Sequence, residues 1–230
     1  MYRGVAFFDI DGTVFRSSLL IEQVRYCVAE GLFPPEARNI YQPLERAWHE
    51  RTGTYEHYIK AVIDAFMSHI RGISYTDFVA INKKIVQDKR HHVYRFTREL
   101  LKELKEDDYF LVAISQSPKG ILDDFCEGLG FHKVYGRLYE LGPSDRFTGK
   151  IIDEHLISNK ANIVRRVIEK NDLTLAHSIA VGDTDGDVPM LEQVKMPICF
   201  NPNEALYRQA KRNQWRVMVE RKDVIYEIRG

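Results

Sequence analysis

The sequence predicts an α/β fold in which a parallel sheet carries an inserted domain made only of helices. Strand-like and helix-like segments alternate from about residue 91 to the end of the chain, which is typical of an open sheet covered by helices. One further strand-like segment, near the N-terminus, is followed by helical patterns alone over residues 18–89. Acidic residues follow two of the predicted strands, and we expect them to mark the functional edge of the sheet.

The composition is that of an ordinary globular protein and excludes several classes of partner. Of 230 residues, 44% are hydrophobic and 29% charged, which excludes wholesale disorder. The 33 basic residues balance the 33 acidic ones, and this zero net charge argues against nucleic acid or an anionic membrane as partner. Three scattered cysteines without a CxxC pair fit a reducing compartment. Because no signal-peptide pattern or membrane-length apolar run is present, we expect a cytoplasmic protein.

Short apolar segments predict the strands of the sheet. The first, residues 2–8, is aromatic and β-branched and runs into a polar turn, as expected for a buried parallel strand. Further strands are expected over residues 110–114, 178–181, 197–200 and 216–219. Helices are expected between and after them, over residues 92–105, 118–129, 159–170, 188–194 and 204–213. Short strands around a turn at residues 142–145 are expected within the irregular stretch 133–152.

Residues 18–89 predict a separate helical domain. Glycines and prolines divide them into four helix-like stretches, over residues 19–29, 35–51, 55–70 and 75–88. In the third stretch Tyr58, Val62 and Phe66 belong to an apolar stripe at three- and four-residue steps, the pattern of an amphipathic helix. We therefore divide the chain into a sheet domain, residues 1–17 and 90–230, and an inserted helical domain, residues 18–89.

Two acidic turns carry most of the chemical information. Asp9 and Asp11 follow the first strand, and the period of two along a strand places their side chains on one side. Asp183 and Asp187 come directly after strand 178–181, so both turns are expected at the carboxyl edge of the sheet. Carboxylates gathered there would repel one another, and a hard divalent cation, Mg²⁺, resolves the repulsion. For either turn alone, a local role of Asp in turns and caps is the alternative.

Two further residues are candidates for binding an anion. Ser115 follows strand 110–114 just before a predicted helix, where a hydroxyl and free backbone N–H groups form an anion site. Capping of that helix is the alternative role for Ser115. Lys160 lies in the first turn of helix 159–170, where a cation interacts unfavourably with the helix dipole, and this leaves room for a role beyond the helix. A solvated lysine is the alternative.

In chain order, these residues resemble the four motifs of the haloacid dehalogenase (HAD) superfamily of phosphohydrolases: Asp9-x-Asp11-Gly12-Thr13, Ser115, Lys160, and Gly182-Asp183 with Asp187. Thr148-Gly149 and Pro189-Met190, with their neighbours, resemble the phosphoserine-phosphatase-like subclass, subfamily IB. The resemblance covers the sheet domain from residue 7 to about residue 190. It implies a Rossmannoid three-layer core with a parallel sheet, and the all-α insertion resembles the C1-type cap of the family.

The resemblance implies an enzyme, a phosphoric monoester hydrolase that uses Mg²⁺ and takes a small-molecule phosphate monoester. Asp9 would attack phosphorus and form an aspartyl-phosphate, and Asp11 would act as general acid and then general base. The metal would be held by Asp9, Asp183 and the backbone carbonyl of Asp11. The remaining implied roles are phosphate binding by Ser115, Lys160 and Gln116, and support of the site by Asp187, Gly12 and Thr13.

Two other functions stay open as alternatives. The same core serves phosphotransferases and phosphomutases, which deliver the phosphoryl group to a sugar. A receiver-like signalling module also gathers acids, a hydroxyl and a lysine around a phospho-accepting Asp, although such modules are typically much shorter. Within the resemblance, the chain has Ser18 where phosphoserine phosphatases carry a substrate-binding glutamate, and Gln116-Ser117 where they carry two glycines. Both departures argue against phosphoserine as the substrate.

Overall fold

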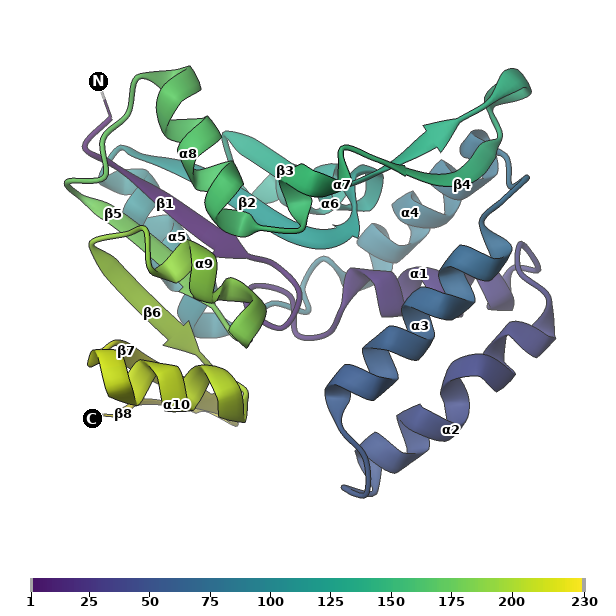
Figure 1. The fold of residues 1–230 in the computed structure, drawn as a ribbon, viewed down its shortest axis with the longest axis horizontal. Coiled ribbons are helices and arrows are strands. Elements are labelled where there is room, and N and C mark those ends of the chain that lie inside the picture. Colours follow the sequence, from purple (N-terminus) through teal and green to yellow (C-terminus); the bar gives the residue numbers. More distant parts are fainter. Residues whose placement is uncertain (1, 229–230) are drawn as a thin grey trace.

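The computed structural model describes residues 2–228 and confirms the predicted α/β architecture with a helical cap (Figure 1). Within the described residues the strands form one sheet in the order β4-β3-β2-β1-β5-β6-β7-β8. The strands are β1 (Gly4–Asp9), β2 (Tyr109–Pro118), β3 (Lys133–Leu141), β4 (Phe147–Ile152), β5 (Ser178–Gly182), β6 (Met196–Phe200), β7 (Arg216–Arg221) and β8 (Val224–Ile228). All neighbours from β3 to β7 pair in parallel, and the two edge strands pair antiparallel. The carboxyl ends of β1, β2 and β5 therefore meet at one edge.

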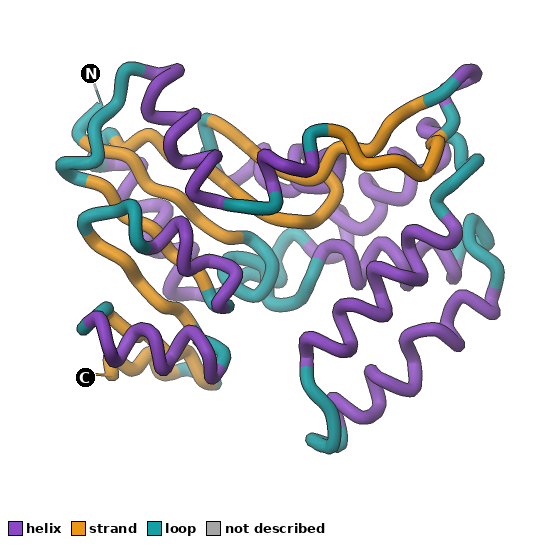
Figure 2. The backbone as a smooth tube through the Cα atoms, viewed as in Figure 1, coloured by secondary structure: helices purple, strands orange, loops and turns teal. Residues whose placement is uncertain are grey.

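Helices cover both faces of this sheet, as the smooth trace shows (Figure 2). They are α5 (Arg95–Glu106), α6 (Lys119–Cys126), α7 (Glu154–Ile157), α8 (Lys160–Asn171), α9 (Val188–Leu191) and α10 (Glu204–Asn213). Alternate side chains of β1 point to opposite faces. Ala6 and Phe8 belong to the apolar cluster that contains α5 and α6 side chains, whereas Val5 and Phe7 belong to the cluster beneath α8, α9 and α10. β1 is thus buried on both faces, which explains its unbroken apolar sequence.

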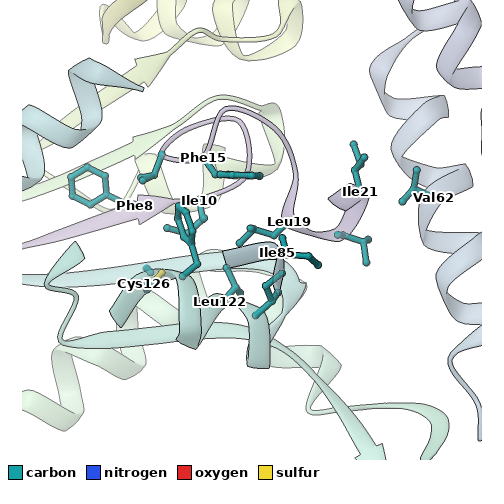
Figure 3. Close-up of a cluster of buried hydrophobic side chains, with 14 of the residues drawn as sticks. Phe8, Ile10, Phe15, Leu19, Ile21, Val62, Ile85, Leu122 and Cys126 are labelled. Atoms are coloured by element: carbon teal, nitrogen blue, oxygen red, sulfur yellow. The ribbon is translucent and has the colours of Figure 1, made fainter. Parts of the chain in front are cut away.

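The cap consists of α1 (Leu19–Ala29), α2 (Arg38–His49), α3 (Tyr55–His69) and α4 (Tyr75–Lys89), which lie beyond the carboxyl ends of the parallel strands (Figure 1). Thr54 and Ser74 cap α3 and α4 by accepting backbone N–H groups with their side chains. The apolar core continues from the sheet into the cap. Figure 3 shows Leu19 of α1 and Ile85 of α4 beside Leu122 of α6 in one cluster of buried side chains.

Backbone hydrogen bonds also join the cap to the sheet domain. Its two connecting segments lie side by side, because the backbone N–H of Arg16 donates to His92 O at 2.8 Å and that of Tyr94 to Val14 O at 3.0 Å. At the far end, the α3–α4 loop pairs with β4 through Gly72 N and Phe147 O at 2.8 Å. The division of the chain at residues 17/18 and 89/90 stays a prediction, and its outermost residues, 1 and 229–230, lie outside the described part of the chain.

The strands expected around residues 142–145 form the β3–β4 hairpin, but several element bounds differ from the prediction. β2 continues to Pro118, past the expected strand end at residue 114, because its pairing with β3 shifts register between Ile114 and Pro118. The expected helix over 118–129 ends at Cys126 and continues as a 3-10 turn. Helix α2 ends before Arg51, whose φ of 61° is left-handed. The sequence analysis missed β8 and the single-turn α7.

No helix among residues 2–228 has both the length and the apolar character needed to cross a membrane.

Candidate active site

Asp9 is the last residue of β1 and is buried at the carboxyl edge of the sheet. Its residue exposure is 5%, and its Oδ1 accepts a hydrogen bond from Lys160 Nζ at 2.5 Å. Its other carboxylate oxygen, Oδ2, is buried without a partner in the described structure. Burial raises the pKa of Asp9 to about 8, and Asp187 and Asp11 add to the rise while Lys160 opposes it. The positive charge of Lys160 therefore does not fully offset the burial of the Asp9 carboxylate.

Lys160 is the cation that the structure supplies. It begins α8, whose N-cap Asn159 accepts Ala161 N with its side chain, and its ammonium lies inside the site, not in solvent. Nζ donates to Asp9 Oδ1 and to Asp187 Oδ1, each at 2.5 Å. Burial alone would lower the pKa of Lys160, but the two carboxylates outweigh it and raise the pKa, so the group stays an ammonium. The solvated alternative for Lys160 is wrong.

The second acidic turn is organised by Asp187. Its Oδ2 accepts the backbone N–H groups of Asp183 at 3.0 Å and Thr184 at 3.1 Å, while Oδ1 accepts Lys160. Both oxygens are therefore engaged. The turn folds so tightly that a Cβ at Gly182 would lie 2.5 Å from the Asp187 side chain, which explains the glycine. The neighbouring Asp185 is exposed, as expected for a turn residue without a role in the site.

Asp183 faces the first acidic turn. Its Oδ1 accepts the hydroxyl of Thr13 at 3.2 Å, which joins the two turns. Gly12 makes this approach feasible, because its φ is 82° and a Cβ there would lie 2.1 Å from Asp183 Oδ2. Burial raises the pKa of Asp183 well above its usual range, and the carboxylates of Asp9 and Asp187 contribute.

Three carboxylates thus form a buried acidic group. One oxygen each from Asp9, Asp183 and Asp187 lie within 4.8 Å of one another. Since Asp187 already accepts donors on both oxygens, the residues with free capacity for a cation are Asp9 and Asp183. Oxygen donors alone are the set that Mg²⁺ prefers, so the residues present fit this metal.

The Asp11 carboxylate lies outside this acidic group. Its Oδ1 accepts the backbone N–H of Leu19 at 2.6 Å, at the start of α1. Its Oδ2 accepts two hydroxyls, from Ser115 and, at 2.7 Å, from Ser117. The structure therefore aims the two acids of the first turn at different partners, Asp9 at Lys160 and Asp11 at the end of β2.

A comparison with known proteins agrees with this geometry. A model of the family described as haloacid dehalogenase-like hydrolase matches residues 6–192. The chain belongs to this family.

Relatives of this HAD hydrolase lie in the phosphoserine-phosphatase-like part of the family. The inhibition of morphological differentiation protein of Streptomyces azureus is 26% identical, over 94% of this chain and 78% of that protein. A phosphoserine phosphatase of Archaeoglobus fulgidus is 32% identical, over 47% of this chain and 32% of that protein. The solved structure of a phosphoserine phosphatase as a phospho-aspartyl intermediate analogue has a TM-score of 0.65 at 19% identity, over 97% of this chain and 96% of that one, and shows the shared fold.

Within the HAD hydrolase site, the hydroxyls of β2 differ from the sequence expectation. Ser115 does not cap α6, which begins after Pro118 and has no side-chain cap. It is buried and donates to Asp11. Gln116, expected to bind phosphate, is exposed, and its Oε1 accepts Arg137 Nη2 at 2.6 Å. The structure thus brings Ser115, but not Gln116, to the buried acids.

Two residues near the HAD hydrolase site were missed from the sequence. Ser117 contacts Asp11, and the Ser-x-Ser spacing at the end of a strand was the signal, because it places two hydroxyls on one side. Tyr55, at the start of α3 in the cap, is the other. Burial raises the pKa of its phenol, and the charges of Asp11 and Asp183 contribute to the rise. No pattern in the sequence singled out Tyr55.

Proposed function

We propose that this HAD hydrolase is an Mg²⁺-dependent phosphatase that hydrolyses a small phosphate monoester through an aspartyl-phosphate on Asp9. The observation that carries the proposal is the state of the Asp9 carboxylate. One oxygen is held by Lys160 at 2.5 Å, and the other is buried and unpartnered at the edge of the sheet. A carboxylate fixed on one side and free on the other is arranged for attack on an electrophile.

Asp9 and Asp183, with the backbone carbonyl of Asp11, would hold the metal. When bound, Mg²⁺ supplies positive charge against the buried carboxylates and the phosphoryl oxygens. The raised pKa values of Asp9 and Asp183 support this proposal, because they indicate that the carboxylates lack sufficient positive charge without a metal.

The residues of the chain account for both halves of the reaction. A carboxylate oxygen of Asp9 attacks phosphorus, and the bond from phosphorus to the ester oxygen breaks as Asp11 gives that oxygen its proton. Asp11 then takes a proton from the water that attacks the aspartyl-phosphate, which releases inorganic phosphate and the free Asp9 carboxylate. Lys160 and Ser115 bind the phosphoryl oxygens and position them for both steps.

The presence of the helical cap favours a small molecule as the substrate. The charges of Asp11 and Asp183 contribute to the raised pKa of Tyr55 in the cap, and a cap over the site excludes bulk water during the reaction. Ser18, where phosphoserine phosphatases carry a glutamate, is buried. Although relatives of this chain are named phosphoserine phosphatases, we propose a phosphate monoester other than phosphoserine.

A phosphate-release screen over a panel of metabolites, with Mg²⁺ and with EDTA, tests the proposal. We expect release from at least one monoester, its loss in EDTA and its recovery when Mg²⁺ is added. Asp9→Asn, which removes the nucleophile at nearly constant volume, should abolish turnover and leave the fold intact. Retained activity of Asp9→Asn contradicts the proposal. Transfer of phosphate to an added alcohol in place of water would identify a phosphotransferase, and a long-lived phosphoprotein without turnover a signalling module.

A further inference from the structure

We propose that Ser117 is a positioning residue that holds Asp11, the acid and base of the proposed reaction, and links it to the first turn of the cap. The inference rests on the proposed phosphatase function. Ser117 is 2% exposed and occupies the irregular end of β2, where the register against β3 shifts. Ser117 is one of the two residues that this sequence has where phosphoserine phosphatases carry paired glycines.

The contacts of Ser117 fix the direction of its hydroxyl proton. Its Oγ accepts the backbone N–H of Leu20 at 3.2 Å and lies 2.7 Å from Oδ2 of Asp11. Because Oγ takes the Leu20 N–H as an acceptor, its own proton is free to be donated to Asp11. The hydroxyl is thereby held between one backbone donor of the cap and one acceptor of the catalytic loop.

The same contacts provide the N-terminal cap of α1. The side chain of Ser18, the N-cap residue of α1, makes no capping hydrogen bond. Instead, Leu19 N donates to Asp11 and Leu20 N to Ser117, so two residues of the sheet domain satisfy backbone donors that a helix leaves free at its start. The position of Asp11 and the start of the cap are therefore determined by one set of hydrogen bonds.

Ser117 matters most when the leaving group departs. In the proposed reaction Ser115 donates to a phosphoryl oxygen, which leaves Leu19 N and Ser117 to hold Asp11. These two contacts keep the Asp11 carboxyl group in the position from which it gives its proton to the leaving oxygen. Loss of the Ser117 hydroxyl should therefore slow esters whose leaving oxygen needs that proton, and should spare esters with a good leaving group.

The test compares kcat/KM for two esters, because this constant reports the steps through departure of the leaving group. Glycerol 2-phosphate has a strongly basic leaving oxygen, and p-nitrophenyl phosphate has a weakly basic one. For Ser117→Ala we expect kcat/KM to fall about tenfold more on glycerol 2-phosphate than on p-nitrophenyl phosphate. Ser117→Cys, which keeps the shape but donates weakly, should show the same selectivity. Ser117→Thr, which keeps the hydroxyl, should restore the wild-type ratio.

Ser178→Ala is the matched control. Ser178 is a buried strand serine whose Oγ donates to Leu175 O at 2.7 Å and accepts Lys195 N at 2.9 Å, at the opposite end of the sheet from the site. Its loss should change stability but not the ratio between the esters. An equal fall on both esters in the Ser117 variants, or no fall, overturns the inference. If the wild-type protein hydrolyses no monoester, neither these two nor any of the metabolite panel, the proposed function fails instead, and the positioning role fails with it.

Discussion

The ammonium of Lys160 lies 2.5 Å from the Asp9 carboxylate, and the two side chains are only 6% and 8% exposed. A second bond of the same length joins Lys160 to Asp187. Since α8 begins at Lys160 and β1 ends at Asp9, a single lysine connects two elements that are far apart in the sequence. Removal of either partner would leave a buried charge without compensation.

Lys160→Met is therefore expected to cost both stability and activity. Without the ammonium, Asp187 stays buried without the cation that offsets its charge and Asp9 loses its hydrogen bond from Nζ, so the free energy of unfolding should fall by about 3–5 kcal/mol. Urea unfolding at neutral pH measures this change. Lys170→Met, on an exposed lysine in the last turn of the same helix, should change stability by no more than about 0.5 kcal/mol. Equal effects of the two substitutions would contradict a structural role for the Lys160 pairs.

The raised pKa of Asp9 predicts that stability depends on pH and on metal together. Unfolded Asp titrates near 3.8, whereas folded Asp9 titrates near 8. Between these values the folded state holds a proton that the unfolded state has released. The contribution of Asp9 to the free energy of unfolding therefore falls as pH rises through this window in metal-free protein. A bound divalent cation replaces the proton, so Mg²⁺ should stabilise the protein more at higher pH.

Thermal unfolding at about pH 5 and about pH 8, in EDTA and in excess Mg²⁺, measures this linkage. The rise in Tm caused by Mg²⁺ should be larger at the higher pH, because protons no longer compete for the carboxylates. Asp183→Asn, which removes one of the two carboxylates with free capacity, should shrink that rise. A rise in Tm that is the same at both pH values would argue against metal binding at these acids.

Gly12→Ala tests whether the two acidic turns need to approach each other closely. The new Cβ would lie 2.1 Å from Asp183 Oδ2, and alanine is also strained at a φ of 82°. We expect Asp183 to be displaced and Mg²⁺-dependent activity to fall by at least about tenfold, since misplacement by about 1 Å is costly in a preorganised site. Gly31→Ala separates the two causes, because Gly31 has a φ of 77° with nothing near its Cβ position. It should lose stability but keep activity, and a similar loss of activity in both variants would contradict the steric explanation.

Features of the fold that depend on a local pattern of residues could be predicted from the sequence. Apolar runs that end in acidic turns identified β1 and β5, and the order of the motifs predicted that Asp9, Lys160 and Asp183 lie at one edge of the sheet. Parallel strands buried on both faces leave this clear signal. β8 was missed because Val224–Ile228 is an edge strand whose side chains are largely exposed, so no buried run marks it.

The details of the site depend on contacts that local pattern does not encode. A period of two along the strand predicted Asp9 and Asp11 on one side, yet the Asp11 carboxylate is turned to Leu19 N and to the hydroxyls of β2. Those partners come from another strand and from the cap, so only the tertiary fold determines the direction.

Asp11→Asn distinguishes the chemical role of Asp11 from its structural one. An asparagine keeps a carbonyl oxygen for Leu19 N, so α1 keeps its cap and the free energy of unfolding should change by about 1 kcal/mol or less. The amide has no carboxyl proton to give to a leaving oxygen, so kcat/KM on an alkyl phosphate should fall by about 10²–10⁴. Asp11→Ala removes both functions and should lose stability as well. Unfolding curves and phosphate-release rates for the two variants check this, and an alkyl phosphatase activity that survives in Asp11→Asn would show that the proton comes from another group.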